Sequence, residues 1–293
     1  MKIQSLSICV PTKKCPNNCH FCVAHMHKKD YKNQIESNKR FVDLYTKDYK
    51  NRLMFARDNG CNTIMFTGDG EAITNMTFLE KFALWNESLP NPFRWLELQS
   101  SGILLHDENL RFLRSTIGIN TISLSLSSIF SSDVNARYNR TKKSLKVDID
   151  KVCSEIKRYD FNLRLSLNMS DVYNSVNPID IFNRAKELGA DQITFRKLYM
   201  SGVAEENEQN KWIEEHKYLD HKWAELRDYI LKNGTALEIL PFGATKYSIH
   251  DFAVVVDDDC MSTEIKGDTF KYLVLRENCK LYSKWEDKNS LIF

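Results

Sequence analysis

The chain alternates between short β-branched segments and longer helical segments, and this alternation limits its fold more than any other feature. Six segments have the composition of strands: residues 3–10, 63–67, 95–99, 121–127, 162–168 and 192–198. A segment predicted as helical follows each of them: residues 36–59, 76–87, 108–115, 148–159, 178–188 and 209–233. Six strand–helix units in series predict an α/β fold with a parallel sheet and right-handed crossovers.

Six units are too few to close an eight-stranded barrel, so we expect a partial (β/α)6 TIM-type barrel. After Gly234 the pattern changes to strands without helices, at residues 236–240, 252–256, 270–275 and 280–285. We therefore predict a core at residues 1–234 and a β-rich C-terminal cap at residues 235–293. Asn177 and Pro178 predict a helix start, and Gly60, Gly189 and Gly234 predict left-handed helix stops.

The composition is that of an ordinary globular chain, with 42% hydrophobic and 27% charged residues in 293. Lys and Arg total 41 against 39 for Asp and Glu, a net charge of +2. This charge does not favour nucleic acid as a partner, although it leaves that possibility open, and it does not favour an anionic membrane. No apolar run reaches the roughly 20 residues of a membrane helix. The start resembles a strand rather than a signal peptide, so we expect a cytoplasmic protein with reduced thiols.

Three of the eight cysteines lie together on a predicted loop directly after the first strand. Cys15, Cys19 and Cys22 follow Pro11, and Pro16 with two asparagines favours a loop over a helix. Three thiolates could hold three irons of a 4Fe-4S cluster and leave the fourth iron open to another ligand. A structural zinc ion is the alternative, with a histidine at position 20, 25 or 27 as fourth ligand. The third possibility is that the cysteines are buried as small hydrophobic residues.

A glycine-rich acidic turn, Gly68-Asp69-Gly70-Glu71, follows the second strand. Glycine allows the backbone to approach a ligand closely, and the glutamate carboxylate can bind an ammonium group. In parallel barrels the chemistry lies at the carboxyl ends of the strands. The turn and the cysteine loop should therefore face the same functional end.

The Cys-x-x-x-Cys-x-x-Cys loop with Phe21 before the last cysteine, followed by this turn, resembles the radical S-adenosylmethionine (radical SAM) superfamily. The resemblance covers about residues 3 to 198. It implies that Cys15, Cys19 and Cys22 ligate a 4Fe-4S cluster whose open iron binds S-adenosylmethionine. Asp69 occupies the first glycine of the family's Gly-Gly-Glu turn and Ala72 its following proline, a departure that we expect to loosen the turn.

The same resemblance assigns further residues to the cofactor. Phe21 would lie against the adenine, Gly70 and Glu71 would receive the methionine ammonium, and Ser125 would contact the ribose. Ser127 stands where many members carry an acid. Asn168 and Arg196, which end the fifth and sixth strands, would bind the ribose or the carboxylate.

The resemblance implies an enzyme that reductively cleaves S-adenosylmethionine to a 5′-deoxyadenosyl radical and removes hydrogen from a small-molecule or nucleotide-like substrate. It also implies a reductant such as flavodoxin or ferredoxin. Cys260 and Cys279, in the predicted cap, are candidates for returning a hydrogen atom or contacting the substrate. Two alternatives stay open: an activase of a glycyl-radical partner enzyme, and a zinc-bearing binding module.

Overall fold

All six predicted strands form, and they are consecutive parallel neighbours in one sheet. The computed structural model describes residues 1–12, 15–27, 29–39, 44–202, 208–240, 244–257 and 268–293. The six strands are β1 (Lys2–Cys9), β2 (Thr63–Thr67), β3 (Trp95–Ser100), β4 (Thr121–Leu126), β5 (Asn162–Met169) and β6 (Gln192–Lys197). The β-branched runs thus predicted the core strands to within two residues at each end.

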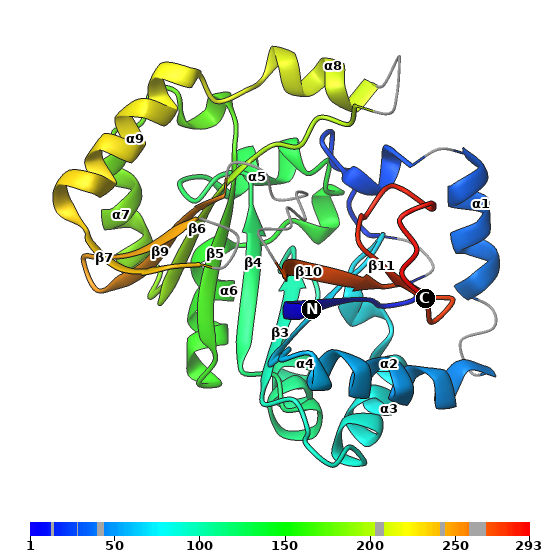
Figure 1. Cartoon of the computed structure of the whole chain (residues 1–293). Helices are drawn as coiled ribbons and strands as arrows, with labels where there is room; N and C mark the ends of the chain where they lie inside the picture. Colours follow the sequence, from blue (N-terminus) through cyan, green and yellow to red (C-terminus); the bar gives the residue numbers. More distant parts are fainter. Residues whose placement is uncertain (13–14, 28, 40–43, 203–207, 241–243, 258–267) are drawn as a thin grey trace.

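The C-terminal strands extend this sheet at both edges. They are β7 (Thr235–Ile239), β8 (Thr245–Ile249), β9 (Phe252–Asp257), β10 (Thr269–Leu275) and β11 (Leu281–Tyr282). β10 pairs in parallel with β1, and β9 pairs in parallel with β6. The strand order is β11-β10-β1-β2-β3-β4-β5-β6-β9-β8-β7, so the sheet curves as a partial barrel and does not close (Figure 1). The C-terminal segment is β-rich, as predicted, but β9 and β10 join the core sheet instead of building a separate layer. The boundary at residue 234 stays a prediction.

Helices cover the outer side of the sheet (Figure 1). The described α-helices are α1 (Lys29–Asn38), α2 (Thr46–Asp58), α3 (Met76–Glu87), α4 (Asp107–Phe112), α5 (Ser132–Tyr138), α6 (Ile149–Arg158), α7 (Pro178–Glu187), α8 (Glu208–Glu215) and α9 (Asp220–Asn233). A π-helical turn at Leu113–Ile117 continues α4. The segments 36–59 and 209–233 were each predicted as one helix and are two. The second breaks where Lys217 forms a β-bridge with Ser170.

Two of the three predicted glycine stops are confirmed. Gly60 has φ 86° and Gly189 has φ 71°, both left-handed. The prediction for Gly234 is wrong, because its φ is −104° and the chain passes directly into β7. A Cβ atom at Gly234 would lie 2.7 Å from the carbonyl oxygen of Ile230, so close packing rather than a left-handed turn requires glycine there.

The two faces of the core strands differ in polarity. Leu6, Ile8, Ile64 and Phe66 alternate on β1 and β2 and are fully buried in the main apolar core. The intervening positions on the core strands carry residues such as Ser7 and Thr63, which line a cavity. Since side chains alternate between faces in a strand, the inner face of the barrel is polar over much of its length. Among the described helices, none has the length and apolar character needed to cross a membrane.

Candidate active site in the barrel cavity

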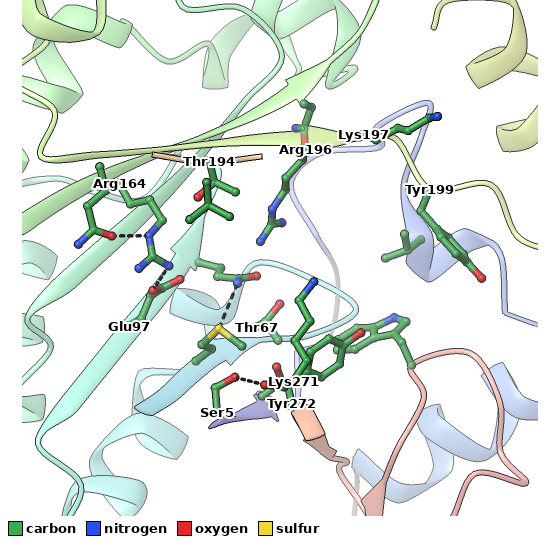
Figure 2. A pocket seen from close by; sticks show the side chains of 18 of the residues that line it. Ser5, Thr67, Glu97, Arg164, Thr194, Arg196, Lys197, Tyr199, Lys271 and Tyr272 are labelled. Atoms are coloured by element: carbon green, nitrogen blue, oxygen red, sulfur yellow. Dashed lines mark hydrogen bonds and ion pairs between the residues drawn. The ribbon is translucent and has the colours of Figure 1, made fainter. Parts of the chain in front are cut away.

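A cavity of about 620 Å³ lies inside the curve of the sheet. Strands from different parts of the sheet contribute to its wall, among them β1 through Ser5, β6 through Thr194 and β10 through Lys271 (Figure 2). Its size is in the range of small-molecule and cofactor sites. Its lining combines apolar side chains with charged ones such as Glu97, Arg164 and Arg196, so the cavity can bind a polar ligand.

A charged network lies on the cavity wall, away from the cysteine loop. Arg164 Nη1 donates a charge-assisted hydrogen bond to Glu97 Oε2, and Arg164 Nε donates to Gln192 Oε1 at 2.8 Å (Figure 2). Glu97 is only 4% exposed, and its Oε1 is buried without a hydrogen-bond partner in the described structure. A buried carboxylate oxygen without a donor is costly, and a ligand N–H or O–H group could supply one.

A second set of polar side chains lies four residues further along β5 and β6. Asn168 and Arg196 are direct neighbours in the β5–β6 register, as Arg164 and Gln192 are. At about 3.3 Å per residue, the two levels are about 13 Å apart along the strands. Asn168 Nδ2 donates to Ser125 Oγ at 3.2 Å, and the Arg196 side chain points into the cavity (Figure 2). The structure therefore brings together three of the residues predicted to bind the cofactor.

The cysteine loop borders this upper level. Cys19 and Cys22 line the cavity together with Phe21. Burial raises the pKa of all three loop thiols, that of Cys15 to about 11, and the neighbouring thiols raise the pKa of Cys19 further. Burying three groups that repel one another when ionised favours a bound cation, because thiolates are the form that binds metal.

The end of α5, a helix that the sequence did not predict, supports the loop. Asn18 donates its backbone N–H to the Asn139 carbonyl at 3.2 Å, and the Cys19 thiol lies 3.7 Å from Asn139 Oδ1. Thr141 Oγ1 donates to Asn17 Oδ1 at 2.7 Å. These contacts fix the middle of the loop against the barrel rim.

Two of the three loop histidines have partners other than the cysteines. In the part of the chain that the structure describes, no three Cys, His, Asp or Glu side chains converge as ligands of a single ion. His27 Nε2 lies 3.1 Å from Asp69 Oδ1, and the His20 ring stacks on Trp212 of α8 with centroids 4.9 Å apart. Zinc requires four ligands around one point, whereas three thiolates of a cluster bind different irons and lie further apart. The donor set fits a cluster better than a zinc ion.

The glycine-rich turn lies beside the start of the cysteine loop. A Cβ atom on Gly70 would overlap Thr12 Oγ1, so the close approach of the two loops requires glycine. Glu71 Oε2 accepts hydrogen bonds from the Ser101 amide at 2.9 Å and from the Ser101 hydroxyl at 2.6 Å. Glu71 Oε1 is buried without a partner in the described structure, and the charge of Glu71 raises the pKa of Cys15. An ammonium group next to the loop could satisfy this oxygen, so the residues present fit the predicted cofactor.

Two of the other predicted residues lie away from the cavity wall. Cys279 is buried in the main core, where burial raises its pKa to about 12. Ser127 Oγ donates to Asn139 Oδ1 at 2.9 Å and is therefore turned toward α5. Cys260 lies outside the described residues. The catalytic roles of Cys260 and Cys279 stay predictions, and the position of Cys279 does not favour its role.

Sequence reasoning missed the charged wall of the cavity, although the strands carried a signal. Arg164 and Asn168 alternate along β5 with the buried residues Leu163, Leu165, Leu167 and Met169. Strands buried on both faces of a parallel sheet are usually almost continuously apolar. A regular polar alternation in such strands indicates that the barrel encloses a polar cavity.

Comparison with known proteins identifies the family. The model of the Radical SAM superfamily matches residues 9–208, more than half of the chain. The chain therefore belongs to the radical SAM superfamily of enzymes. No curated protein matches it.

Solved structures agree with this fold. A tagged form of anSMEcpe with bound AdoMet matches with a TM-score of 0.65 and 13% identity, over all of this chain and 74% of that chain. Native anSMEcpe with bound AdoMet and the Cp18Cys peptide matches with a TM-score of 0.54 and 13% identity, over 79% of this chain and 59% of that one. Coproporphyrinogen III oxidase (HemN) from Escherichia coli, a radical SAM enzyme, matches with a TM-score of 0.52 and 14% identity, over 79% of this chain and 52% of that one. At these identities the likeness is one of fold.

Proposed function

We propose that this protein holds a 4Fe-4S cluster on Cys15, Cys19 and Cys22, cleaves S-adenosylmethionine there, and acts on a small polar or nucleotide-like substrate in the barrel cavity. One observation carries the proposal: the cysteine loop, Asn168 and Arg196 border the same polar cavity of about 620 Å³. Family membership supplies the class of cofactor. The geometry supports the assignment of individual residues.

Each group has a defined task in this proposal. Glu71 Oε1, the buried oxygen without a partner, would accept from the methionine ammonium. Asn168 and Arg196 would bind the ribose or the carboxylate, with Ser125 holding the Asn168 amide in orientation. Phe21, which lines the cavity, would contact the adenine. When bound, cluster and cofactor supply one-electron cleavage of the sulfonium to methionine and a 5′-deoxyadenosyl radical.

The deeper level of the cavity supports a polar substrate. Glu97 Oε1 offers an acceptor to an N–H or O–H donor, while Arg164 and Gln192 beside it offer donors. Arg196, at the upper level, and Lys271 of β10 add positive charge to the lining. A small molecule with an N–H or O–H donor and an anionic group would fit this wall, and nucleotide-like compounds have both. A wall that fixes the substrate below the cofactor would also place a C–H bond within reach of the radical.

Anaerobic reconstitution tests the proposal. We expect brown protein with about four irons per chain, which forms 5′-deoxyadenosine from S-adenosylmethionine with dithionite as reductant. Cys19→Ala should lose the cluster and all cleavage. Cys153→Ala is the matched control, because Cys153 is a buried free thiol on α6 away from the loop, and it should keep both. Colourless protein with one zinc, or normal cleavage by Cys19→Ala, would contradict the proposal.

Flavodoxin and ferredoxin are the reductants that we propose for the enzyme in the cell. Replacing dithionite with either reduced protein in the same assay tests this point. We expect 5′-deoxyadenosine to form at a rate that saturates with the concentration of the electron donor. No product with either donor, while dithionite still works, would reject them without affecting the cofactor assignment.

A further inference from the structure

A buried charged cluster lies outside the cavity and has no role in the proposed function. His27 follows the cysteine loop, Asp69 lies in the glycine-rich turn, and Arg276 follows β10 near the C-terminus. The three side chains are 1%, 8% and 2% exposed. Three segments far apart in the sequence therefore meet at one sealed point beside the proposed cofactor site.

Asp69 is the centre of this cluster. Its Oδ1 lies 3.1 Å from His27 Nε2, and its Oδ2 accepts from Arg276 Nη1 at 3.3 Å. Burial alone raises the pKa of a carboxyl, but the charge of Arg276 and the hydrogen bond from His27 outweigh it and lower the pKa of Asp69 to about 2. Asp69 is therefore a charged residue held between two partners.

Aromatic rings enclose the arginine. The Arg276 guanidinium lies 4.3 Å from the centroid of the Trp285 ring and 5.5 Å from that of Tyr31. Arg276 Nη2 also donates to the Trp285 carbonyl at 2.5 Å. Stacking on these rings and hydrogen bonds to a carboxylate and a backbone carbonyl hold the Arg276 side chain in one orientation. A surface arginine would be free to move between several.

The cluster gives a structural reason for the aspartate at position 69, where this chain departs from the family's turn. The family's turn has glycine there, and the sequence led us to expect a looser turn in this chain. Glycine has no side chain with which to bind Arg276 or His27. The ion pair instead ties the turn that carries Gly70 and Glu71 to the C-terminal segment and to the exit of the cysteine loop.

We propose that Asp69 and Arg276 are positioning residues, through which the C-terminal segment holds the glycine-rich turn and the cysteine loop in the geometry that binds S-adenosylmethionine. The inference rests on the proposed function for its ligand, and on the cluster alone for the ordering of the two loops. Residues 276–285 thus complete the cofactor site from outside the segment that matches the family model.

Two measurements on Asp69→Gly, which restores the family's residue, test the inference. The first is hydrogen exchange of the apoprotein, where amides of residues 15–27 and 67–74 should exchange at least about tenfold faster. The second is the Kd for S-adenosylmethionine of the reconstituted protein, which should rise about tenfold or more while the iron content stays normal. Asp69→Asn keeps the shape and removes the charge, so it serves if the glycine variant does not fold. Arg276→Lys should give the same changes to a smaller extent.

Asp107→Asn is the matched control, because Asp107 pairs with Arg111 and Arg158 at the exposed surface. It should leave both readouts at wild-type values. Wild-type exchange and Kd in Asp69→Gly would overturn the inference, as would a lowered melting temperature with an unchanged Kd. If the wild-type protein itself fails to bind S-adenosylmethionine, the proposed function fails, while hydrogen exchange still decides whether the cluster orders the two loops.

Discussion

Two buried ion-pair networks lie in the same barrel and differ in what surrounds them. The Glu97–Arg164–Gln192 network lines the cavity, with the Arg164 side chain 29% exposed and one oxygen of Glu97 unpaired. The His27–Asp69–Arg276 cluster is closed by Trp285 and Tyr31, and its arginine is 2% exposed. In the first network, water or a ligand can replace a protein partner of a charged group. In the second, only other parts of the chain are close enough to do so.

This difference separates a network that can bind a ligand from a cluster that holds parts of the chain in place. Leaving a charge unpaired in a sealed site costs several kcal/mol, but the cost falls where water can enter. The cavity network is therefore free to change partners during a reaction cycle. The sealed cluster is suited to holding loops in place, and its loss should affect folding more strongly.

Truncation of the two arginines gives the largest expected effect. Arg276→Leu should lower the free energy of unfolding by about 3–5 kcal/mol, because Asp69 loses its buried counter-charge. Arg164→Leu should cost about 1–2 kcal/mol, because the Arg164 side chain is 29% exposed and its removal would let water from the cavity reach the Glu97 carboxylate. Urea unfolding of the two apoproteins measures both values. Equal losses would break the distinction between a sealed and an open network.

The pH dependence of the free energy of unfolding provides a second test of the sealed cluster, through Glu277 beside Arg276. Burial raises the pKa of Glu277, which lies 3.9 Å from Arg276, to about 7 despite the favourable charge of Arg276. Asp69 opposes ionisation of Glu277, and Lys39 favours it. The folded state then binds a proton that the unfolded state releases between about pH 4.5 and 7, so this group makes stability fall as the pH rises through that window.

Glu277→Gln should remove this contribution. The free energy of unfolding of the variant minus that of wild type should increase by up to about 3 kcal/mol from pH 4.5 to 7.5. Each unit of pKa shift contributes about 1.4 kcal/mol to this difference. Unfolding curves at intervals of half a pH unit measure it, and the comparison of two chains cancels the histidines. A constant difference across this range would show that Glu277 ionises normally.

The smallest effect should come from the cavity. Glu97→Gln keeps the shape of the side chain and removes its charge, so stability should change by less than about 1 kcal/mol in a partly solvated pair. The same unfolding assay applies. A loss above about 3 kcal/mol would place this network with the sealed one and remove the reason to assign it to a substrate.

The sequence predicted the strands well and the charged contacts poorly, for a physical reason. β-branched composition is local, so residues 63–67 predict β2 without reference to the rest of the chain. The pairs Arg164–Glu97 and Arg276–Asp69 join residues 67 and 207 positions apart, and depend on strand register and on where β10 attaches. Helix α5 was missed because its seven residues give too short a periodic pattern, although Ser131 caps it.

The cysteine loop and its neighbours were easier to locate, because they follow strands whose carboxyl ends share one rim. Asn168 and Arg196 lie side by side, because each is the next-to-last residue of its strand and β5 and β6 are neighbours. Cys279 was placed in the site only because it lies in the C-terminal segment. The structure buries it in the core, where its carbonyl accepts a hydrogen bond from Arg52 Nε of α2 at 3.2 Å.

A crystal structure of the anaerobically reconstituted protein with S-adenosylmethionine tests the account most directly. We expect the cluster on Cys15, Cys19 and Cys22, the cofactor within hydrogen-bond distance of Glu71, Asn168 and Arg196, and no ligand atom touching Asp69 or Arg276. A cofactor bound outside the cavity, or one that contacts Asp69 or Arg276 directly, would contradict the division between a binding wall and a supporting cluster.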